Sequence, residues 1–302
     1  MPMIGSFKEI NEIASRSEPV RTAIIAPEDR EFILAVKQAQ DQSLIDPVFL
    51  GRHKLIAKVA EKMRLDLDPQ EIVEIEDRQA VADHALQMLY QGDVHMVSKG
   101  QIPTEFIYRS VIKTKKEHTE GTIVSVITVW DIKNCDHLVL LSDPGANIKP
   151  NEAQKLEIVD NAVKAARVLG CQDPIAIELI SDPTNLYIKS KPEQEVKTPT
   201  IRQYRGKYNL ADVTSLKGVL VENVDCRINL NNLPHILLLP DLDTGNVVAK
   251  LDFFIKNIVR VSFTHTSRGP VLLPSRADSA ESILREITFG VGLVALQQRN
   301  IS

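Results

Sequence analysis

The chain has 302 residues, of which 43% are hydrophobic and 25% are charged, and its formal net charge is -4. This length suffices for two compact domains, and a weakly acidic chain without a basic tract gives no reason to expect nucleic acid as a partner. No apolar run reaches membrane-spanning length, and residues 1–18 lack the apolar core of a signal peptide, so we expect a cytoplasmic protein without a membrane partner.

Strands and helices are predicted to alternate along the first part of the chain. Apolar and β-branched runs predict strands at 21–26, 47–50, 72–75 and 94–98. Helical periodicity predicts helices at 6–16, 28–40, 52–63, 79–90 and 104–112. Such alternation with short links is typical of a mostly parallel sheet with helices on both faces, so the predicted class is α/β.

The second part of the chain continues this alternation with one exception. The run at 122–130 predicts a strand buried on both faces. Further strands are predicted at 137–141, 174–180, 217–222, 235–239 and 259–263, helices at 152–169 and 247–258, and a turn at 240–246. Residues 181–214 contain several prolines and little periodicity, and they predict an exposed connection.

The cysteines Cys135, Cys171 and Cys226 are odd in number and far apart. We find no close histidine partner for them in the sequence pattern, so neither a disulfide framework nor a zinc site is expected. We predict small buried or half-buried side chains and no metal site, with a catalytic thiol as the alternative.

The chain ends in a short apolar strand, a polar elbow and a helix, at residues 269–302. The elbow holds Ser275, Arg276 and Asp278, and the first helical turn is expected to carry Ser279 and Glu281. An elbow after the carboxyl end of a strand is where open α/β sheets bind ligands, because the N–H groups of the following helix favour anions. The alternative is an ordinary N-cap, formed by Asp278 or Ser279, with Arg276 solvated.

Four short motifs lie at strand ends in a defined order: KGQIPT at 99–104, SDPGANIKP at 142–150, PDLDTGN at 240–246 followed by Lys250, and SRADSAE at 275–281. With the order of the elements, they resemble the phosphate acetyl/butyryltransferase family, particularly its phosphate butyryltransferase branch, over nearly the full length. The resemblance implies transfer of a short-chain acyl group (acetyl, butyryl or branched) between coenzyme A and inorganic phosphate. Coenzyme A and phosphate would be substrates, with no permanently bound cofactor, and the chain would form a homodimer or larger homo-oligomer.

The resemblance also implies a fold related to the isocitrate and isopropylmalate dehydrogenases. Two α/β domains would enclose the active site, and the second would be inserted in the first. On this pattern the first domain comprises residues 1–135 and 269–302, and the second comprises residues 136–268.

Roles for the elbow residues follow from the implied reaction. The thiol of coenzyme A must lose its proton, and the attacked carbonyl and the departing phosphate need positive or N–H partners. We predict that Arg276 clamps the phosphate, that Ser275 hydrogen-bonds the phosphate or the oxyanion, and that Asp278 is the base, with Glu281 as the alternative base.

Further residues are predicted to bind substrate, each with a structural alternative. They are Lys99, Thr104, Ser125, Asp143, Asn147, Gly245, Asn246, Ser279 and Glu281. The alternatives are a solvated Lys99, an N-cap at Thr104, turn roles for Asp143 and Asn147, and a backbone role for Gly245 and Asn246, which we favour. His265 is expected to be a surface residue rather than a base.

One departure from the family pattern leaves a second function open. The segment 222–234 is shorter than in the family, and its residues 222–232 lack the Gly and Pro of the family's turn. The alternative is therefore a non-catalytic paralogue that keeps the fold and coenzyme A binding.

Overall fold

The computed structural model describes residues 3–65, 72–121, 123–179, 201–203, 233–250 and 258–301. The chain divides into two compact units. Unit 1 comprises Met1–Gly5 and Ile127–Arg260, and unit 2 comprises Ser6–Val126 and Val261–Ser302. The domain limits expected from the family, 1–135 with 269–302 and 136–268, stay a prediction.

Unit 2 is built on a sheet in the order β3-β2-β1-β4-β11-β10. These strands are β1 (Val20–Ile25), β2 (Ile45–Gly51), β3 (Ile72–Glu74), β4 (Met96–Lys99), β10 (Ile258–His265) and β11 (Pro270–Leu272). All neighbouring pairs from β3 to β11 are parallel, and β10 runs antiparallel to β11. The carboxyl ends of β1, β4 and β11 therefore meet at one edge of the sheet.

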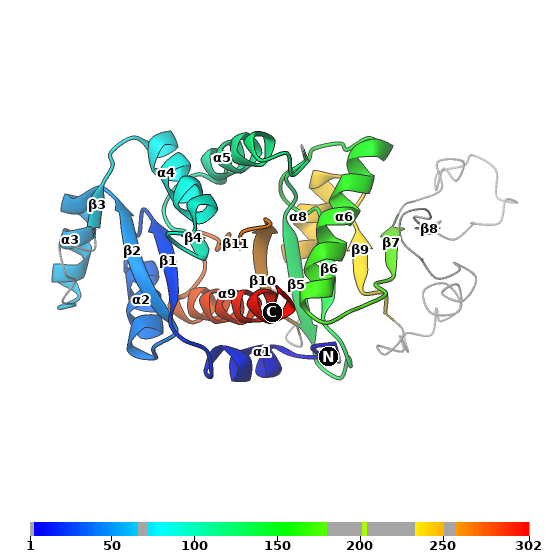
Figure 1. Ribbon diagram of the computed structural model, residues 1–302, viewed down its shortest axis with the longest axis horizontal. Coiled ribbons are helices and arrows are strands. Elements are labelled where there is room, and N and C mark those ends of the chain that lie inside the picture. Colours follow the sequence, from blue (N-terminus) through cyan, green and yellow to red (C-terminus); the bar gives the residue numbers. More distant parts are fainter. Residues whose placement is uncertain are drawn as a thin grey trace, which may run out of the picture. The chain divides into compact units, whose positions relative to one another are not determined.

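Helices cover both faces of this sheet. They are α1 (Phe7–Ala14), α2 (Arg30–Asp41), α3 (His53–Lys62), α4 (Arg78–Gln91), α5 (Thr104–Glu117) and α9 (Ala280–Ile301). Helices α4 and α5 pack together on one face, and α1 and α2 pack against α9 on the other (Figure 1). Apolar side chains of the strands and of α4 and α5 form a core on that face, among them Ile25, Leu86, Val97, Val111 and Val271.

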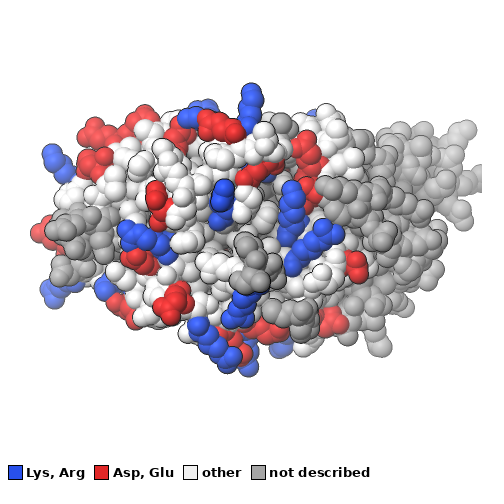
Figure 2. Space-filling view, in the orientation of Figure 1, with Lys and Arg blue, Asp and Glu red and all other residues white. Residues whose placement is uncertain are grey.

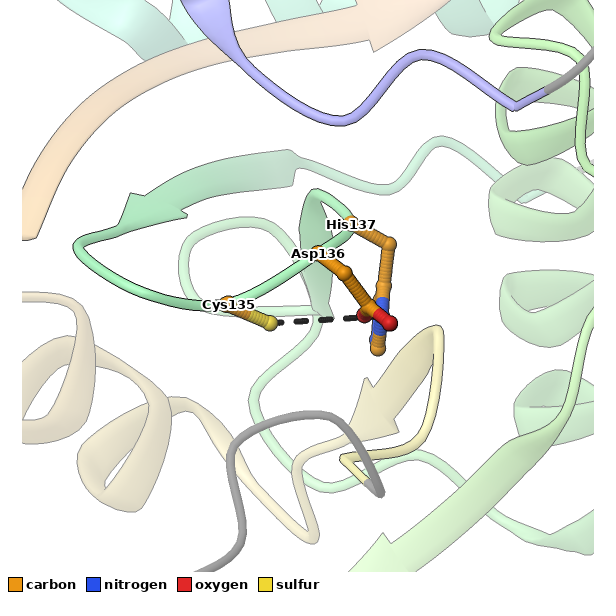
Figure 3. A group of neighbouring side chains, drawn as sticks. All are labelled: Cys135, Asp136 and His137. Atoms are coloured by element: carbon orange, nitrogen blue, oxygen red, sulfur yellow. Dashed lines mark hydrogen bonds and ion pairs between the residues drawn. The ribbon is translucent and has the colours of Figure 1, made fainter.

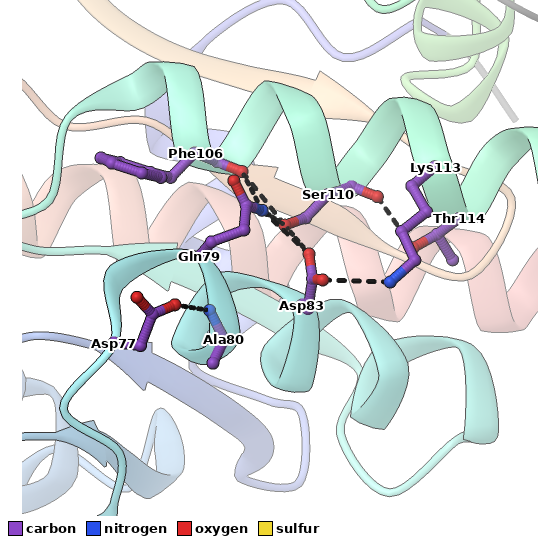
Figure 4. Close-up of polar contacts among 8 residues, drawn as sticks. All are labelled: Asp77, Gln79, Ala80, Asp83, Phe106, Ser110, Lys113 and Thr114. Atoms are coloured by element: carbon purple, nitrogen blue, oxygen red, sulfur yellow. Dashed lines mark hydrogen bonds and ion pairs between the residues drawn. The ribbon is translucent and has the colours of Figure 1, made fainter.

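A polar network joins α4 to α5 (Figure 4). The carboxylate of Asp83 accepts hydrogen bonds from Ser110 Oγ (2.5 Å), Gln79 Nε2 (2.9 Å) and Lys113 Nζ (3.0 Å). Burial raises the pKa of Asp83, but these hydrogen bonds outweigh burial and leave the pKa below its ordinary value. Because the carboxylate is well supplied with donors from its own helices, we assign this cluster to helix packing.

Within unit 1 the strands follow one another in the order β5-β6-β9-β7-β8. Its strands are β5 (Ile127–Ile132), β6 (Val139–Ser142), β7 (Ala176–Leu179), β8 (Ile201–Gln203) and β9 (Ile236–Leu238), and its helices are α6 (Glu152–Val168) and α8 (Leu242–Lys250). Strands β6, β9 and β7 are mutually parallel, whereas the outer pairs β5–β6 and β7–β8 are antiparallel. The predicted α/β class, with mostly parallel sheets and helices on their faces, is confirmed.

Several element predictions are wrong in detail. The strand predicted at 122–130 begins only at Ile127, although Val124, Ser125 and Val126 before it are buried. The turn predicted at 240–246 is instead the start of α8, because Asp241 Oδ1 accepts the N–H of Thr244 (2.8 Å) and caps a helix.

Two more predictions concern the segment between residues 181 and 234. Strand β8 lies inside the stretch predicted as a connection. The strand predicted at 217–222, and most of the segment 222–234, lie outside the described residues.

Candidate active site

The predicted site edge in unit 2 is formed by the loops that follow β1, β4 and β11. Strand β4 pairs with β1 on one side and with β11 on the other, so Ile25 lies beside Lys99 and Leu272 beside Ser98. The N–H of Gly100 donates to Ile25 O (2.7 Å) and that of Gln101 to Ala26 O (2.8 Å). A Cβ on Gly100 would lie 2.4 Å from Ala26 O, so this close approach of two loops requires glycine.

The elbow is a turn closed by its own polar groups. Asp278 Oδ2 accepts the N–H of Ser275 (2.8 Å), and the N–H of Asp278 donates to Ser275 O (3.0 Å). The N–H of Ala277 points to Ser275 Oγ at 3.4 Å. Ser275 and Asp278 are therefore held in place by each other, through a bond that lies within the elbow and is not the N-cap bond considered as the alternative.

The amino end of α9 is also occupied by protein groups. The helix begins at Ala280, so Ser279 precedes it and accepts the N–H of Ser282 through Oγ (3.3 Å). The N–H of Ala280 donates to Glu31 Oε2 of α2 (3.0 Å). The predicted placement of Ser279 in the first helical turn is wrong, and these N–H groups are already bonded, so an anion at the elbow depends on cationic side chains.

Arg276 and Lys99 supply those cations. Arg276 is exposed, and within the described part of the chain its guanidinium makes no hydrogen bond or ion pair. Lys99 is only 3% exposed, and among the described residues its ammonium donates one hydrogen bond, to Gly100 O at 3.3 Å. The alternative of a solvated Lys99 is therefore wrong.

The charge environment of Lys99 links it to the elbow. Burial lowers the pKa of Lys99 to about 8, Glu286 opposes this effect, Arg276 adds to it, and Asp278 and Asp29 oppose it. Lys99 and the two elbow residues, Arg276 and Asp278, thus share one electrostatic environment. An anion at this edge would meet two cations whose mutual repulsion it relieves.

Three acidic side chains around this edge escaped the sequence-based prediction. Asp29 caps α2 and accepts from Gln101 Nε2 (2.6 Å), Glu31 binds the N–H of Ala280, and Glu286 accepts the N–H of Ser262 (2.8 Å). Asp29 follows a buried strand in the position of an N-cap, which is a signal that was available in the sequence. Glu31 and Glu286 lie on helices, and only the packing shows where they point.

The remaining predicted residues of unit 2 have more ordinary settings. Thr104 is the half-buried first residue of α5, and the N-cap is Pro103 rather than Thr104. Ser125 is buried, and His265 is half-buried at the end of β10. The side chain of Glu281 is 84% exposed and pairs with Arg285 (3.0 Å), so it is a weaker candidate for the base than Asp278.

In unit 1, Asp143 organises the loop after β6. Its buried carboxylate accepts from the N–H groups of Gly145, Ala146 and Asn147, and from Asn147 Nδ2 at 2.6 Å. Gly245 of α8 lies against this loop, because a Cβ there would be 2.7 Å from Pro144 Cα. These contacts support the structural alternatives for Asp143, Asn147 and Gly245. Substrate contacts by them, and by the half-buried Asn246, stay predictions.

Cys135, Asp136 and His137 gather in the turn between β5 and β6 (Figure 3). His137 Nδ1 lies 2.7 Å from Asp136 Oδ1 and 3.9 Å from Cys135 Sγ, so the expectation that no cysteine has a close histidine is wrong. Burial raises the pKa of the Cys135 thiol, which disfavours the thiolate that a metal needs. Asp136 already engages the facing ring nitrogen, and we assign no metal function to this turn.

The predicted burial of the cysteine side chains is confirmed where the structure describes the residue. Cys135 is half-buried and Cys171 is buried, and burial raises the pKa of Cys171 to about 11. Cys226 lies outside the described residues.

Acidic and basic side chains are interspersed on the face shown in Figure 2. None of the described helices is long and apolar enough to cross a membrane. On this face, attraction of an anion therefore depends on local cations rather than on a broad positive patch.

Comparison with solved structures defines the class of fold. The chain superimposes on a branched-chain phosphotransacylase from Enterococcus faecalis with a TM-score of 0.63 and 22% identity, covering 91% of this chain and 99% of that one. It superimposes on a phosphotransacetylase from Streptococcus pyogenes with a TM-score of 0.64 and 14% identity, covering 95% and 97%. The fold is that of the phosphotransacylases.

Sequence comparison then narrows the resemblance. No protein-family model matches the chain. The phosphate butyryltransferase of Clostridium acetobutylicum is 26% identical over 307 aligned positions, which cover 95% of this chain and 97% of that one. The phosphate acetyltransferase of Thermotoga maritima is 24% identical and covers 89% and 93%. The resemblance to the phosphate acetyl/butyryltransferases, predicted from the strand-end motifs, is confirmed.

Proposed function

We propose that this protein moves a short-chain acyl group between coenzyme A and inorganic phosphate. The observation that carries the proposal is the exposed guanidinium of Arg276, without a polar partner in the described residues, in the elbow after β11, while the buried ammonium of Lys99 ends the neighbouring strand β4. Two cations at the carboxyl edge of a parallel sheet form a suitable site for a phosphate group. The full-length relatives carry names that describe this reaction.

The proposed reaction forms a carbon–sulfur bond and breaks a carbon–oxygen bond. The sulfur of coenzyme A attacks the carbonyl carbon of an acyl phosphate, and phosphate leaves with the electron pair of the broken bond. The proton of the thiol passes to a base and finally to phosphate or water, and the reverse reaction uses the same steps. Arg276 offers a planar pair of donors to the phosphate oxygens, so it stabilises the charge that grows on the leaving group.

Ser275 and Asp278 are the other proposed catalytic residues. The hydroxyl of Ser275 would donate to the phosphate or to the oxyanion, and Asp278 would accept the proton of the thiol. Their mutual hydrogen bonds hold the turn that carries both groups. Such fixed placement lowers the cost of orienting the groups during the reaction.

The substrates, the cofactor, the location and the oligomeric state are proposed from the resemblance to the relatives. Coenzyme A, acyl-coenzyme A and phosphate are substrates, no cofactor is permanently bound, and the chain acts in the cytoplasm as a homodimer or larger homo-oligomer. The relatives give no support to a non-catalytic paralogue. The shortened segment 222–234, which motivated that alternative, lies mostly outside the described residues.

An acyl-transfer assay tests the proposal. Purified protein is mixed with coenzyme A and acetyl, butyryl or branched-chain acyl phosphate, and thioester absorbance is followed. We expect turnover with at least one donor, and Arg276→Ala should lower kcat/KM by about 10²- to 10³-fold, because it removes a charge partner of the transition state.

Arg109→Ala is the matched control, because Arg109 is an exposed arginine of α5 that pairs with Glu105. Its rate should equal that of the wild type. Equal rates for Arg276→Ala and the wild type would refute the role of Arg276, and no turnover with any donor would refute the function.

A further inference from the structure

Lys99 is buried, which is unusual for a lysine of the proposed phosphate site. It is the last residue of β4, its side chain is buried, and β4 pairs with β11, the strand that leads into the elbow. An ammonium group has three N–H donors, and in the described residues they find a single 3.3 Å contact with Gly100 O. Within the described residues, the ammonium therefore has N–H donors that can bind a ligand.

The charged groups that act on Lys99 belong to α9, to the cap of α2 and to the elbow. Glu286 belongs to α9, Asp29 caps α2, and Arg276 and Asp278 belong to the elbow. Each of the three carboxylates already accepts hydrogen bonds elsewhere, from Ser262 N–H, from Phe32 N–H and Gln101, and from Ser275 N–H. They act on Lys99 through space, and among the described residues none makes an ion pair with it.

A bound dianion would change this balance. Its oxygens would supply the acceptors that the ammonium lacks, and its charge would offset both the burial of Lys99 and the repulsion from Arg276. The charged form of Lys99 is thus stabilised more strongly with the anion present than without it.

We propose that Lys99 is a proton-linked cation of this site: binding of a phosphate-class dianion at Arg276 draws a proton onto the Lys99 amine, and departure of the anion releases it. The inference rests on the proposed function for the identity of the anion as inorganic or acyl phosphate. The proton linkage itself is a property of anion binding and is measurable without turnover.

The direction of the pH dependence follows from the pKa of Lys99, which is about 8 without a ligand. At pH 7 the amine is already mostly protonated, so binding takes up about 0.1 proton, whereas uptake rises to about 0.5 at pH 8 and about 0.9 at pH 9. The affinity of the site for the dianion must therefore fall as pH rises over the same range, by up to about tenfold per pH unit above pH 8.

Isothermal titration calorimetry of the full chain measures this uptake. Sulfate is the probe, because it resembles a phosphate dianion but does not titrate between pH 7 and 9. Titrations at pH 7, 8 and 9, each in two buffers of different ionisation enthalpy, give the number of protons taken up per sulfate. We expect the rise calculated above, and binding at pH 9 without uptake would overturn the proposal.

Two substitutions isolate the role of the amine. Lys99→Arg keeps the charge but cannot release its proton, so sulfate should bind with similar affinity at pH 7 and pH 9 and without uptake. Lys99→Met should bind weakly at every pH, also without uptake. Uptake that persists in either variant would assign the proton to another group and refute the proposal.

Lys115→Met is the matched control, because Lys115 is also a buried lysine of unit 2 and donates to Ile123 O (3.1 Å). It should keep the uptake of the wild type. Intact uptake without acyl transfer would refute the proposed function alone, acyl transfer without uptake would refute this inference alone, and absence of sulfate binding would refute the anion site.

Discussion

Arg276 and Lys99 are neighbouring cations with different settings. Arg276 is exposed and has no polar partner in the described residues, whereas Lys99 is buried at the end of β4. Arginine stays charged in either setting, but the charge of a buried lysine depends on what lies beside it. The sequence shows both residue types at strand ends, and it does not show this difference between them.

The burial of Lys99 should reduce the stability of the protein. Its pKa in the folded chain is about 8, below the ordinary lysine value of 10.5, so the unfolded chain binds more protons between pH 8 and pH 10.5. Below pH 8 the full cost is present, and stability recovers as pH rises through this window. We expect Lys99→Met to be more stable than the wild type at pH 7, by on the order of 2–3 kcal/mol.

Urea denaturation at pH 7 and pH 10 measures this difference. The advantage of Lys99→Met should shrink at the higher pH, where the wild-type amine is neutral in the folded state. An advantage that does not change with pH would show that the cost of Lys99 is not electrostatic.

At the scale of elements, the site depends on how closely the loops after β1 and β4 approach. Gly100 makes this approach possible, since a Cβ would lie 2.4 Å from Ala26 O and 2.5 Å from Ile25 O. Both neighbouring atoms are backbone, so they cannot rotate away. The position of Lys99 is a direct consequence of this contact.

Gly100→Ala should therefore destabilise the protein by about 1–3 kcal/mol, the usual cost of overpacking, and should weaken sulfate binding. Gly92→Ala is the control, because Gly92 ends α4 with φ 87° and a Cβ there would meet nothing within 4 Å. The control should lose about 1 kcal/mol through backbone strain alone and keep sulfate binding. Denaturation midpoints and calorimetry of both variants decide the matter, and unchanged stability in Gly100→Ala would contradict the close approach.

Element predictions were most accurate where the signal is local. Helices α2 and α4 start where Asp29 and Asp77 cap them. The start of α8 was mistaken for a turn, because its Asp, Gly and Asn residues favour turns and the packing of Gly245 on Pro144 is not visible in the sequence. The strand expected at 122–130 begins late, because β-branched composition signals burial and Val124 is buried without being in a strand.

At the scale of the whole molecule, the chain consists of two units, and the elbow belongs to unit 2. A ligand that binds only the folded chain raises the free energy of unfolding, by about 2.7 kcal/mol at a concentration 100 times its Kd. Anion binding at the candidate site should therefore be measurable as a change in the stability of the whole protein.

Inorganic phosphate should therefore raise the Tm of the protein in scanning calorimetry, progressively with its concentration. Arg276→Ala should abolish most of the shift, and Arg109→Ala should keep it, since Arg109 pairs with Glu105 on the surface of α5. An equal shift in all three proteins would indicate a general salt effect and would count against an anion site at the elbow.

The sequence by itself determined the α/β class, the order of most strands and helices, the elbow with Ser275 and Arg276, and the resemblance to the phosphate acetyl/butyryltransferases. These features depend on periodicity, caps and short motifs, which are carried by residues close together in the chain. Only the tertiary structure decided that Glu31 binds the first N–H of α9, that Lys99 is buried, and that Asp29 and Glu286 lie within its electrostatic reach. Hydrogen-bond partners and pKa values depend on atoms that folding brings together from distant segments, and neither composition nor spacing records those distances.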